Sequence, residues 1–446
     1  MLSVLDTQHR RKDALTPVKH PLHILIIPPE EFVPPQSPVS AIFQYHQGIA
    51  LRNLGHQVGV LSVIPSLALK PLLVSLFRKL TGRRTFYRQI EGVSIRGIFK
   101  AIIRSVLLPG AGRFENINGL TILRRRLYCW SDGTLQEELD YYKSVVESAF
   151  HIYVQKSGRP DIVHVHNAWL AGTACVDVLG SAGIPYCLTE HSTYYARNII
   201  PAHFYPLLRR VYAAARANIV VSPSLKRLLD DRQLSGETRF IPNMLDPTFA
   251  DPLPAFDRHG GVFTFFNVAE LTEKKGHVIL LQAFASAFRG HQNVRLVIGG
   301  SGALMDELEQ RCQTLNISSQ VEFSGMLDRE SLRLKMLQSD VFVLPSLFET
   351  FGVVVIEAMS CGKPVIATVC GGPEDILDRS TGLLIPAGDV DALARAMREM
   401  HAGISSYDPD LIREKALALY GPEIVARSIE TVYREILVDI GNDQDI

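Results

Sequence analysis

The sequence predicts an α/β protein made of two domains, each a parallel sheet covered by helices. Short apolar runs of strand length alternate with helical segments along most of the chain, which is the pattern of strand–helix–strand crossovers. The 446 residues exceed the size of one ordinary core. Residues 247–261 contain three prolines and a Gly-Gly pair, a composition typical of a linker. We therefore expect a cleft between the two domains.

The first domain begins with the apolar run PLHILII at residues 21–27, which predicts a buried strand. A proline-rich loop at 28–38, a helix over about 39–54 and a second strand at 58–63 follow. The same alternation predicts helices at 134–153 and 168–182, and strands at 161–166, 186–189, 217–222 and 239–241. Polar residues gather where these strands end, so we expect them to face the cleft.

The second domain repeats the alternation. Strands are predicted at 262–268, 294–298, 321–323, 341–344 and 365–368, and helices at 277–288, 303–315, 329–337 and about 352–361. The last helix contains Val353, Val354 and Val355, whose branched side chains favour a strand. We expect a helix nevertheless, because two neighbouring parallel strands need a crossover.

Residues 68–126 stand out by charge, since they hold thirteen Lys and Arg against two Glu, interleaved with apolar residues. A basic stretch with an apolar face suits a helix on an anionic membrane surface, because headgroups attract Arg and Lys and the acyl boundary accepts apolar side chains. One alternative is a helix pair packed on the domain with a solvated basic face. Nucleic-acid binding is a weaker alternative, because aromatic residues are sparse here.

Glu349 and Glu357 fall at the carboxyl end of a predicted strand, the edge at which parallel sheets bind ligands. Ionised carboxylates offer only acceptors, so the pair could accept hydrogen bonds from sugar hydroxyls. A helix starting near Gly352 would direct the free N–H groups of Phe351, Gly352 and Val353 outward, toward an anion or sugar hydroxyls. The alternative is that both carboxylates are solvated or form ordinary ion pairs.

Three further positions could contribute to such a site. Gly300 lies in a glycine-rich run that could admit a nucleotide, but the run lacks the spacing of a dinucleotide fingerprint or a Walker A loop and could be a tight turn. Lys275 follows a strand end and could neutralise a phosphate, or be an ordinary surface lysine. His191, beside Glu190 at another strand end, could be catalytic or structural.

The remaining composition argues for a soluble, metal-free protein of a reducing compartment. Hydrophobic residues make up 47% and charged residues 21%, and the formal net charge is zero, so whole-chain charge identifies no partner. The six cysteines form no C-x-x-C pair and no His/Cys cluster at zinc spacing. The chain also lacks a run of about eighteen uncharged apolar residues. We therefore expect a cytoplasmic protein with no membrane span and no metal site.

Several motifs together identify a family. The second half contains PSLFETFGVVVIEAM (345–359) with its E-x7-E pair, CGKPVIAT (361–368), GGPE (371–374) and GLLIPAGDVDALA (382–394). The first half contains PVSAIFQYHQGIALRNLGHQV (38–58), DIVHVHN (161–167), GIPYCLTEHS (183–192) and IPNMLD (241–246). With these motifs the chain resembles the glycosyltransferases of family 4, and most closely the bacterial subgroup that builds exopolysaccharide or lipid-linked glycans.

The resemblance implies the GT-B fold, in which two Rossmann-like domains face each other across a cleft. It implies an acceptor domain at 1–250, a nucleotide-sugar domain at 251–421 and a C-terminal helix at 422–446 that crosses back to the first domain. It further implies a reaction that needs no metal, retains the anomeric configuration and uses no cofactor beyond the nucleotide-diphosphate sugar, here a UDP- or GDP-sugar.

The resemblance also assigns roles by position. Glu357 would bind the ribose of the donor, Lys275 its diphosphate and Glu349 its sugar, with His191 beside that sugar. The residues implied to bind the nucleotide sugar are Lys275, Gly300, Phe351, Gly352, Val353 and Glu357, and those implied to act in catalysis are His191 and Glu349. Many family members carry an Arg where this chain has Glu270, so the diphosphate charge would be shared differently here.

We therefore expect a retaining glycosyltransferase that moves a sugar to a glycan or lipid-linked glycan acceptor in cell-surface polysaccharide synthesis. It would be peripheral at the inner face of the plasma membrane, docked there through the basic stretch, and would bind no nucleic acid. Two rivals remain. A nucleotide-sugar epimerase on the same fold is disfavoured by the E-x7-E and GGPE motifs, whereas a catalytically inactive sugar-nucleotide-binding scaffold subunit is left open by Glu270.

Overall fold

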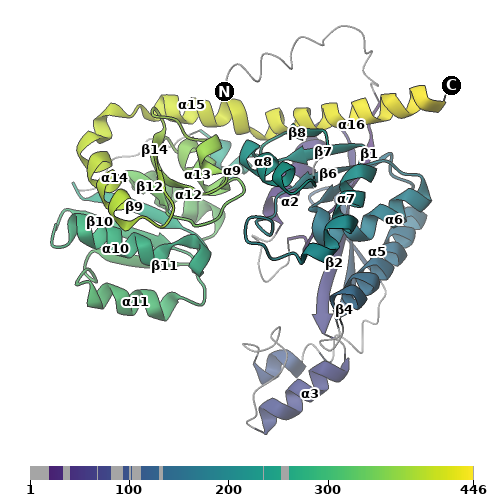
Figure 1. The fold of residues 1–446 in the computed structure, drawn as a ribbon, viewed down its shortest axis with the longest axis horizontal. Coiled ribbons are helices and arrows are strands. Elements are labelled where there is room, and N and C mark those ends of the chain that lie inside the picture. The colour runs from purple at the N-terminus through teal and green to yellow at the C-terminus, as the bar shows by residue number, and fades with distance from the viewer. Residues whose placement is uncertain are drawn as a thin grey trace.

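In the computed structural model the chain forms two α/β domains that lie side by side (Figure 1). The structure describes residues 20–33, 41–67, 69–81, 94–99, 102, 112–129, 134–234, 236–252 and 261–444. Each domain contains one sheet, mostly or wholly parallel, with helices packed on its faces. The predicted α/β class is confirmed.

Within the described residues the first sheet has eight strands, in the order β3-β4-β2-β1-β5-β6-β7-β8. They are β1 (His23–Ile27), β2 (Gln57–Leu67), β3 (Arg113–Ile117), β4 (Leu120–Cys129), β5 (Ile162–His166), β6 (Tyr186–Glu190), β7 (Ala217–Val220) and β8 (Thr238–Phe240). β5 and β6 are parallel, with His166 opposite Thr189. Their carboxyl ends therefore lie together at the edge where His191 follows.

The helical elements of the first domain lie between its strands in the chain and just after the last one. They are α2 (Ile42–Asn53), α3 (Leu69–Leu80), α5 (Leu135–Ser157), η3 (Ala168–Gly172), α6 (Thr173–Ala182), η4 (Ala202–Phe204), α7 (Tyr205–Ala214), α8 (Pro223–Asp231) and α9 (Pro247–Ala250). The start of α5 is fixed by a capping box between Thr134 and Glu137. Ser222 caps α8, because its hydroxyl accepts from the N–H of Leu225 at 3.0 Å.

The second sheet has six strands in the described residues, in the order β11-β10-β9-β12-β13-β14, all parallel. They are β9 (Phe263–Val268), β10 (Val294–Gly299), β11 (Val321–Gly325), β12 (Val341–Leu344), β13 (Val365–Val369) and β14 (Gly382–Pro386). The helical elements are η5 (Glu273–Lys275), α10 (His277–Phe288), α11 (Met305–Thr314), α12 (Arg329–Gln338), α13 (Val353–Ser360), η6 (Pro373–Asp375), α14 (Val390–Gly403), η7 (Ile404–Ser406) and α15 (Pro409–Tyr420).

Helix α13 forms although its first turn is Val353, Val354 and Val355. A β-branched residue costs roughly 0.5 kcal/mol in a helix relative to Ala. Val355 and the following Ile356 are fully buried, and burial of each such side chain stabilises by about 1.5–3 kcal/mol. Packing therefore outweighs local propensity, as the crossover argument requires.

The last helix, α16 (Pro422–Gln444), runs from the second domain along the first (Figure 1). It packs against α2 and contributes Val425, Ile429 and Tyr433 to a core cluster that also contains Ile24 of β1. The Tyr433 hydroxyl lies 2.6 Å from Nδ1 of His164 on β5. The C-terminus thus completes the core of the first domain.

Residues 68–126 lie partly outside the described residues, and the described ones are not helical throughout. Besides α3, this stretch contains β3 and β4, an antiparallel hairpin that turns at Asn118 and Gly119, both with positive φ. The Asn-Gly pair between two apolar runs is the sequence signal for such a hairpin. Arg124 on β4 is buried and lies 2.9 Å from Glu115, so the domain interior holds this cation and the basic stretch is not one lipid-facing helical surface.

The helix predicted at 168–182 is irregular in its first turn. Trp169 and Leu170 have non-helical dihedral angles, and regular helix begins at Thr173. This irregular turn lets the N–H of Ala168 donate to the carboxylate of Glu190 at 2.9 Å. Regular helix therefore begins five residues later than predicted, because Leu170, with a φ of 64°, takes the backbone out of the helical region.

Candidate active site

A close backbone approach brings the loops after β9 and β12 into contact. Gly276 has a φ of 70°, and a Cβ there would lie 2.0 Å from the carbonyl oxygen of Pro345. Any side chain would have to push the two loops apart, so the approach depends on glycine. The loop that carries Lys275 is thereby fixed beside the loop that carries Glu349.

Lys275 and Glu349 form an ion pair in this position. The Lys275 Nζ lies 2.6 Å from Oε1 of Glu349, and the Ser346 hydroxyl donates to the same oxygen at 2.8 Å. The two charged side chains are only 20% and 11% exposed. Glu349 is therefore held by donors of the protein itself, as the ion-pair alternative expects, and the ammonium group of Lys275 stays at a fixed place.

The start of α13 lies next to this ion pair in the chain. Gly352 is its N-cap residue, with a φ of 93°, and no side chain of the described residues caps this end of the helix. The first N–H groups of the helix, together with the positive end of its dipole, are therefore left without a side-chain acceptor there. A lysine and an uncapped helix N-terminus are together suited to bind a phosphate group.

The glycines of the GGPE motif shape the same loop. A Cβ on Gly371 would lie 2.5 Å from the carbonyl oxygen of Glu349, and one on Gly372 would lie 2.5 Å from the backbone of Phe351. The Glu374 carboxylate accepts from the N–H of Gly371 at 2.9 Å and so fixes the turn. The motif therefore supports the backbone on which Glu349 and Phe351 sit.

Glu357 lies one turn into α13 and is buried. Its Oε1 is ion-paired with Nη2 of Arg329, and its Oε2 has no hydrogen-bond partner among the described residues. Burial raises the pKa of Glu357, and the charge of Arg329 opposes that rise. A buried carboxylate oxygen without a donor costs free energy, so the site is suited to a ligand that supplies a hydroxyl donor.

In the first domain, Glu190 fixes the backbone that carries His191. The Glu190 carboxylate accepts from the N–H groups of His191 and Ser192 at 3.0 and 2.8 Å, and from the hydroxyl of Tyr212 at 2.9 Å. Burial raises the pKa of Glu190, although these hydrogen bonds oppose the rise. Glu190 thus holds the turn after β6, and its contact with His191 is through the backbone.

The imidazole of His191 ends a row of three histidines, of which His164 and His166 are fully buried. Its Nε2 lies 2.8 Å from Nδ1 of His166, and the ring of His166 stacks on that of His164 with centroids 4.3 Å apart. Burial lowers the pKa of His164 and of His191 to about 3 and that of His166 further still. The three rings are therefore neutral at physiological pH, so that each offers one N–H donor and one acceptor.

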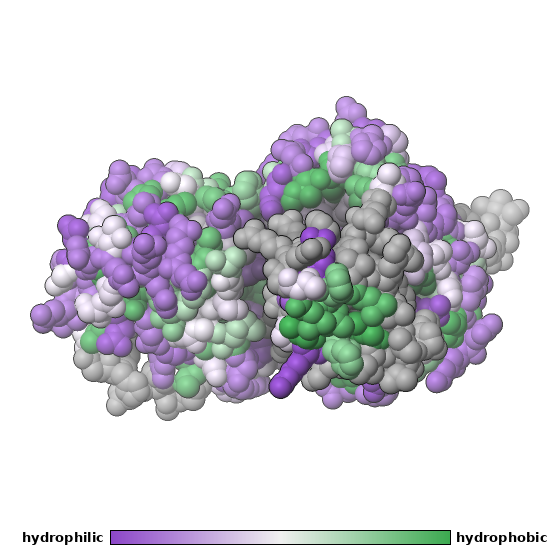
Figure 2. Space-filling view, turned by 90° about the horizontal axis from the view of Figure 1, so that it is seen from below, coloured by the Kyte–Doolittle hydropathy of each residue, from purple (hydrophilic) through white to green (hydrophobic). Residues whose placement is uncertain are grey.

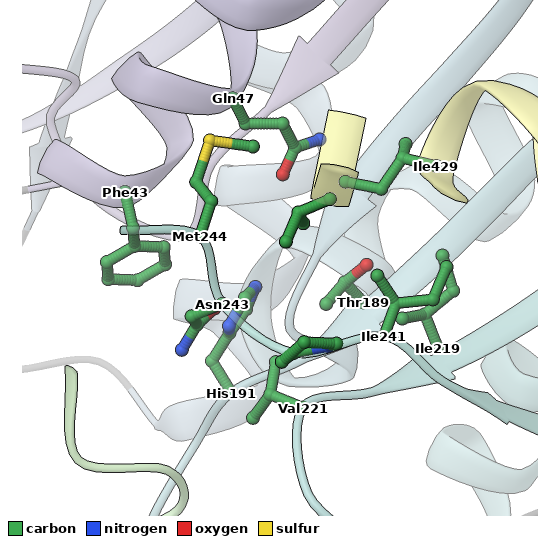
Figure 3. A pocket seen from close by; sticks show the side chains of 12 residues that line it. Phe43, Gln47, Thr189, His191, Ile219, Val221, Ile241, Asn243, Met244 and Ile429 are labelled. Atoms are coloured by element: carbon green, nitrogen blue, oxygen red, sulfur yellow. The ribbon is translucent and has the colours of Figure 1, made fainter. Parts of the chain in front are cut away.

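A narrow pocket opens beside His191 (Figure 3). Phe43 and Gln47 of α2 line one side, and Asn243 and Met244 of the segment after β8 line another. The Nδ1 atom of His191 is buried and has no hydrogen-bond partner among the described residues. The pocket therefore combines apolar walls with polar groups from three segments of the first domain.

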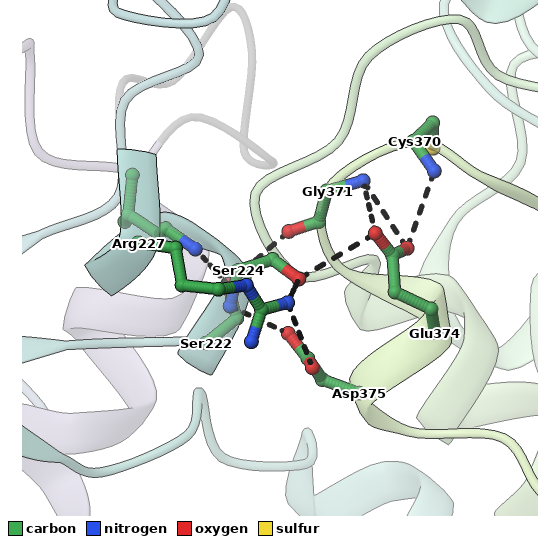
Figure 4. A network of polar contacts seen from close by, with 8 residues as sticks. Ser222, Ser224, Arg227, Cys370, Gly371, Glu374 and Asp375 are labelled. Carbon is green, nitrogen blue, oxygen red and sulfur yellow. Dashed lines mark hydrogen bonds and ion pairs between the residues drawn. The ribbon is translucent and has the colours of Figure 1, made fainter. Parts of the chain in front are cut away.

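The two domains meet through the GGPE loop and the start of α8 (Figure 4). The Ser222 hydroxyl donates to the carbonyl oxygen of Gly371 at 3.2 Å. The N–H of Ser224 donates to the Asp375 carboxylate at 2.8 Å, and this carboxylate lies at the positive end of the α8 dipole. These contacts fix how the carboxyl ends of the two sheets face each other.

Gly300 and Glu270 lie at the neighbouring strand ends. Gly300 has a φ of 117°, and a Cβ there would lie 1.9 Å from the carbonyl oxygen of Ala269, so its backbone conformation and the close approach of the loop after β9 both require glycine. The Glu270 side chain is 64% exposed and lies 4.0 Å from the ammonium group of Lys274. Its negative charge is therefore solvated and partly compensated.

The predicted site residues come from both domains and do not all touch. Lys275 and Glu349 are in direct contact, and Thr350, next to Glu349, donates from its hydroxyl to the carbonyl oxygen of His191 at 2.6 Å. Glu357 forms a separate contact with Arg329. In the chain, Phe351, Gly352 and Val353 lie between Glu349 and Glu357, while Gly300 directly follows β10.

Sequence reasoning missed Arg329 and Thr350. Thr350 is part of the PSLFETFG motif, so its position was predictable and its partner was not. Arg329 is the first residue of α12, directly after the capping Asp328, and a charged residue at that position does not by itself indicate a functional role. The residue that holds it, Asp246, belongs to the IPNMLD motif and lies 83 positions away in the chain.

The described residues form neither a cluster of metal ligands nor a membrane-spanning helix. No group of three or more His, Cys, Asp or Glu side chains is arranged to hold a metal ion in the part of the chain that the structure describes. Among the same residues, no helix combines the length and the apolar character that crossing a bilayer requires.

Two family models match the chain. The model described as "Glycosyl transferases group 1" matches residues 255–404, which include Lys275, Glu349 and Glu357. The model described as "Glycosyltransferase Family 4" matches residues 133–249, which include His191. The two matches together fall on both domains and contain the contacts described above.

Individual proteins match as well. An uncharacterized glycosyltransferase of Methanocaldococcus jannaschii is 30% identical over 384 residues, covering 78% of this chain and 95% of that protein. The 2-deoxystreptamine N-acetyl-D-glucosaminyltransferase of Streptomyces fradiae is 28% identical over 313 residues, covering 62% of this chain and 72% of that protein. The crystal structure of Anabaena HepE in complex with UDP and glucose superposes with a TM-score of 0.64 at 16% identity, covering 92% of this chain and 99% of that one, which shows the fold.

Proposed function

The chain belongs to the glycosyltransferases of family 4 with the GT-B fold, and we propose that it transfers a sugar from a nucleotide-diphosphate sugar to a glycan or lipid-linked glycan acceptor in cell-surface polysaccharide synthesis. The observation that carries the proposal is the contact of Lys275 and Glu349, 2.6 Å apart, beside the uncapped start of α13. Thr350 joins this loop to the backbone of His191 in the other domain. Groups suited to a phosphate, a sugar and a second substrate thus converge between the domains.

The donor is proposed to lie along α13. Its diphosphate would bind at Lys275 and at the N–H groups near Gly352, and its ribose would donate to the free Oε2 of Glu357. Glu349 would accept hydrogen bonds from sugar hydroxyls, with His191 on the opposite side. The HepE structure, solved with UDP and glucose, supports a UDP-sugar as the first donor to try, and a GDP-sugar is the alternative.

The proposed reaction retains the anomeric configuration. The bond between the anomeric carbon and the β-phosphate oxygen breaks, and its electron pair leaves with the diphosphate. The acceptor oxygen then bonds to the anomeric carbon on the face that the diphosphate leaves, and its proton passes to a phosphate oxygen. Negative charge grows on the leaving group, so a fixed cation such as Lys275 and the α13 dipole accelerate the step more than they strengthen substrate binding.

A nucleotide panel tests the donor site. Thermal unfolding is measured with UDP, GDP, ADP and their sugars for wild type, Glu357→Ala and Glu322→Ala, the last an exposed carboxylate on β11. We expect one base to raise the melting temperature of wild type and Glu322→Ala, and to have little effect on Glu357→Ala, because a ligand bound only to the folded state stabilises it. No shift with any of these ligands would contradict the proposal.

A product assay separates transfer from its two rivals. Incubation of the identified nucleotide sugar with acceptor-containing membrane extract is expected to give a glycoside with the anomeric configuration of the donor, as read by NMR. An altered nucleotide sugar formed without acceptor would indicate an epimerase. Nucleotide-sugar binding with no product under either condition would indicate an inactive scaffold subunit.

The acceptor is proposed to be membrane-bound, because an apolar and basic patch lies at the α3 end of the first domain (Figure 2). Phe77 and Leu80 of α3 are 62% and 65% exposed, and Ile95 and Phe99 of the segment at 94–99 are exposed as well. We call this set the α3 patch, and it includes the basic residues Arg78, Lys79 and Arg96. Such a patch fits an anionic bilayer surface, which supports the proposal that the enzyme works at the inner face of the plasma membrane.

A further inference from the structure

Four charged or polar side chains form a chain from the first domain to Glu357. His46 Nε2 of α2 lies 3.0 Å from Oδ2 of Asp246, the residue before α9. The same carboxylate oxygen lies 2.6 Å from Nε of Arg329, at the start of α12. Arg329 reaches Glu357 with Nη2. The guanidinium group is therefore anchored on one side and presented to Glu357 on the other.

The anchoring leaves Arg329 little freedom. Asp246 is 3% exposed, and its carboxylate accepts from Nε of Arg329 at 2.6 Å and from the N–H of Thr248 at 2.8 Å. Burial disfavours its ionisation, but the hydrogen bond from His46 and the charge of Arg329 outweigh burial and hold the pKa of Asp246 well below its ordinary value. The Arg329 guanidinium also lies 4.8 Å from the centre of the Phe249 ring. The two carboxylates and the ring together fix the orientation of the planar guanidinium group of Arg329.

Only one oxygen of Glu357 is used by this arrangement. The Oε1 atom takes the guanidinium, while Oε2 is buried and has no partner among the described residues. Burial favours the protonated form of a carboxyl group, which has one acceptor oxygen fewer than the carboxylate. The cation on Oε1 opposes this effect of burial and so favours Oε2 as an acceptor.

We propose that Arg329 is a positioning residue for nucleotide recognition, which holds the Glu357 carboxylate so that its Oε2 accepts the ribose hydroxyls of the donor. The inference rests on the proposed function, since it assigns Glu357 to the ribose. The inference goes beyond the proposed function because it concerns Arg329, which is given no contact with substrate. Arg329 takes its own position from Asp246 and His46, which lie outside the second sheet. Recognition of the donor ribose thereby depends on a residue of the first domain.

Titration calorimetry of ribose recognition tests the inference. The nucleotide among UDP, GDP and ADP that binds wild type most tightly is compared with its 2′-deoxy and 3′-deoxy forms, for wild type, Arg329→Met, Arg329→Lys and Glu357→Gln. We expect wild type to bind the ribonucleotide about tenfold more tightly than at least one deoxy form, because hydrogen bonds to charged groups are strong. Arg329→Met and Glu357→Gln should lose this preference, and Arg329→Lys should keep part of it.

The pH profile separates positioning from a merely structural role. The charged and titratable groups that face Glu357 are Arg329 from α12, Asp246 from the segment before α9 and His46 from α2. In wild type we expect the ribose preference to be constant from pH 6 to pH 9. In Arg329→Met the preference should be absent at pH 6 and return as pH rises, since a buried carboxyl without its cation ionises only at higher pH.

The matched control is Arg333→Met. Arg333 lies one turn along α12 and donates to the backbone carbonyls of Asp251 and Pro252 at 3.0 and 2.7 Å. This substitution removes an equal charge from the same helix, so we expect the ribose preference to be unchanged. A full preference in Arg329→Met at pH 6, with the variant folded by circular dichroism, would overturn the inference and leave the proposed function standing. Failure of wild type to bind any of the three nucleotides would instead overturn the proposed function.

Discussion

The hydroxyl of Thr350 donates to the carbonyl oxygen of His191 at 2.6 Å, and this bond joins the two halves of the candidate active site. Thr350 precedes α13 in the second domain, and His191 follows β6 in the first. The bond sets the distance between the loop of Glu349 and the imidazole of His191. The relative position of the domains is thus fixed at the place where both substrates would meet.

Replacement of Thr350 by Val should impair transfer more than donor binding. Val keeps the shape of Thr and removes one interdomain hydrogen bond, which is worth about 1 kcal/mol. We expect kcat/KM for sugar transfer to fall about fivefold and the affinity for the nucleotide to stay within about twofold. Steady-state kinetics and calorimetry give the two numbers. Thr314→Val on the surface of α11 is the control, and equal activity of both variants would rule out the role.

Replacement of Lys275 by Met should weaken binding of the diphosphate specifically. The variant removes a cation that lies 2.6 Å from Glu349 and leaves that carboxylate with the Ser346 hydroxyl. A charge-assisted hydrogen bond is worth about 1.5–3 kcal/mol, so affinity for the nucleoside diphosphate should fall about 10- to 100-fold. Affinity for the monophosphate should change little.

The neighbouring Lys274→Met is the control for this charge. Its ammonium group lies 4.0 Å from the exposed Glu270, and an exposed pair of this kind contributes little. Calorimetry with the mono- and diphosphate of the same base measures both variants. An equal loss in the two variants would mean that general surface charge, rather than Lys275, binds the phosphates.

Local sequence patterns were sufficient to predict most of the fold. The strands at 341–344 and 365–368 and the crossover helix between them were predictable, because a buried parallel strand is apolar throughout and must be followed by a crossover. The hairpin of β3 and β4 was missed, because basic residues interleaved with apolar ones also fit a membrane-surface helix. Its signal was the Asn118-Gly119 pair, a local turn residue pattern that outweighs composition.

The contacts of the site residues were harder to predict from the sequence than their positions in the chain. The motifs contain Glu349 and Glu357, and Lys275 was singled out by its place after a predicted strand, but neither signal says which side chain meets which. The contact between Arg329 and Asp246 joins residues 83 positions apart, and that between His164 and Tyr433 joins residues 269 apart. Such pairs are set by the packing of whole helices, which single-sequence patterns do not encode.

The Tyr433 hydroxyl should stabilise the first domain from the last helix. It is buried and lies 2.6 Å from Nδ1 of His164, so Tyr433→Phe leaves a buried ring nitrogen with fewer partners. We expect the free energy of unfolding to fall by about 1–2 kcal/mol, measured by urea denaturation. Thr431→Val, whose hydroxyl bonds only to its own helix at Arg427, should cost less than half as much. A loss no larger than that of the control would show that the Tyr433 hydroxyl does not help to hold α16 on the first domain.

Buried His277 should make the protein less stable in acid. Burial, helped by the charge of Lys275, lowers the pKa of His277 to about 4, against about 6.5 in the unfolded chain. Below pH 6.5 the unfolded state therefore binds a proton that the folded state does not, and stability falls as pH decreases toward 4. Between pH 7.5 and pH 5.0 this group removes about 2 kcal/mol.

The variant His277→Gln isolates this contribution. The substitution changes packing equally at both pH values. Its effect on packing therefore cancels when the loss of stability between the two pH values is compared with that of wild type. We expect wild type to lose about 2 kcal/mol more than His277→Gln between pH 7.5 and pH 5.0, measured by urea denaturation at each pH. Equal losses in the two proteins would show that His277 does not remain neutral in the folded state.

The α3 patch should bind anionic bilayers by both of its components. Insertion of Phe77 and Leu80 removes apolar area from water, and each Lys or Arg near an anionic surface adds about 1 kcal/mol. In flotation with vesicles of phosphatidylcholine and about 30% phosphatidylserine, we expect Phe77→Ser with Leu80→Ser to lose most binding. Arg78→Glu with Lys79→Glu should reduce the partition coefficient at least about thirtyfold, because at least about 2 kcal/mol is removed.

The control for exposed apolar area is Met326→Ser with Leu334→Ser. These residues are 61% and 47% exposed on the second domain, away from the α3 patch, so we expect no change in flotation. Wild type should bind pure phosphatidylcholine vesicles weakly and should lose binding as salt is raised, because the attraction of Arg78 and Lys79 to anionic lipid is screened. Undiminished flotation of both α3 variants would exclude this face as the membrane contact. Loss in the apolar variant alone would mean that the bilayer holds the protein through Phe77 and Leu80 and that the basic side chains serve the fold.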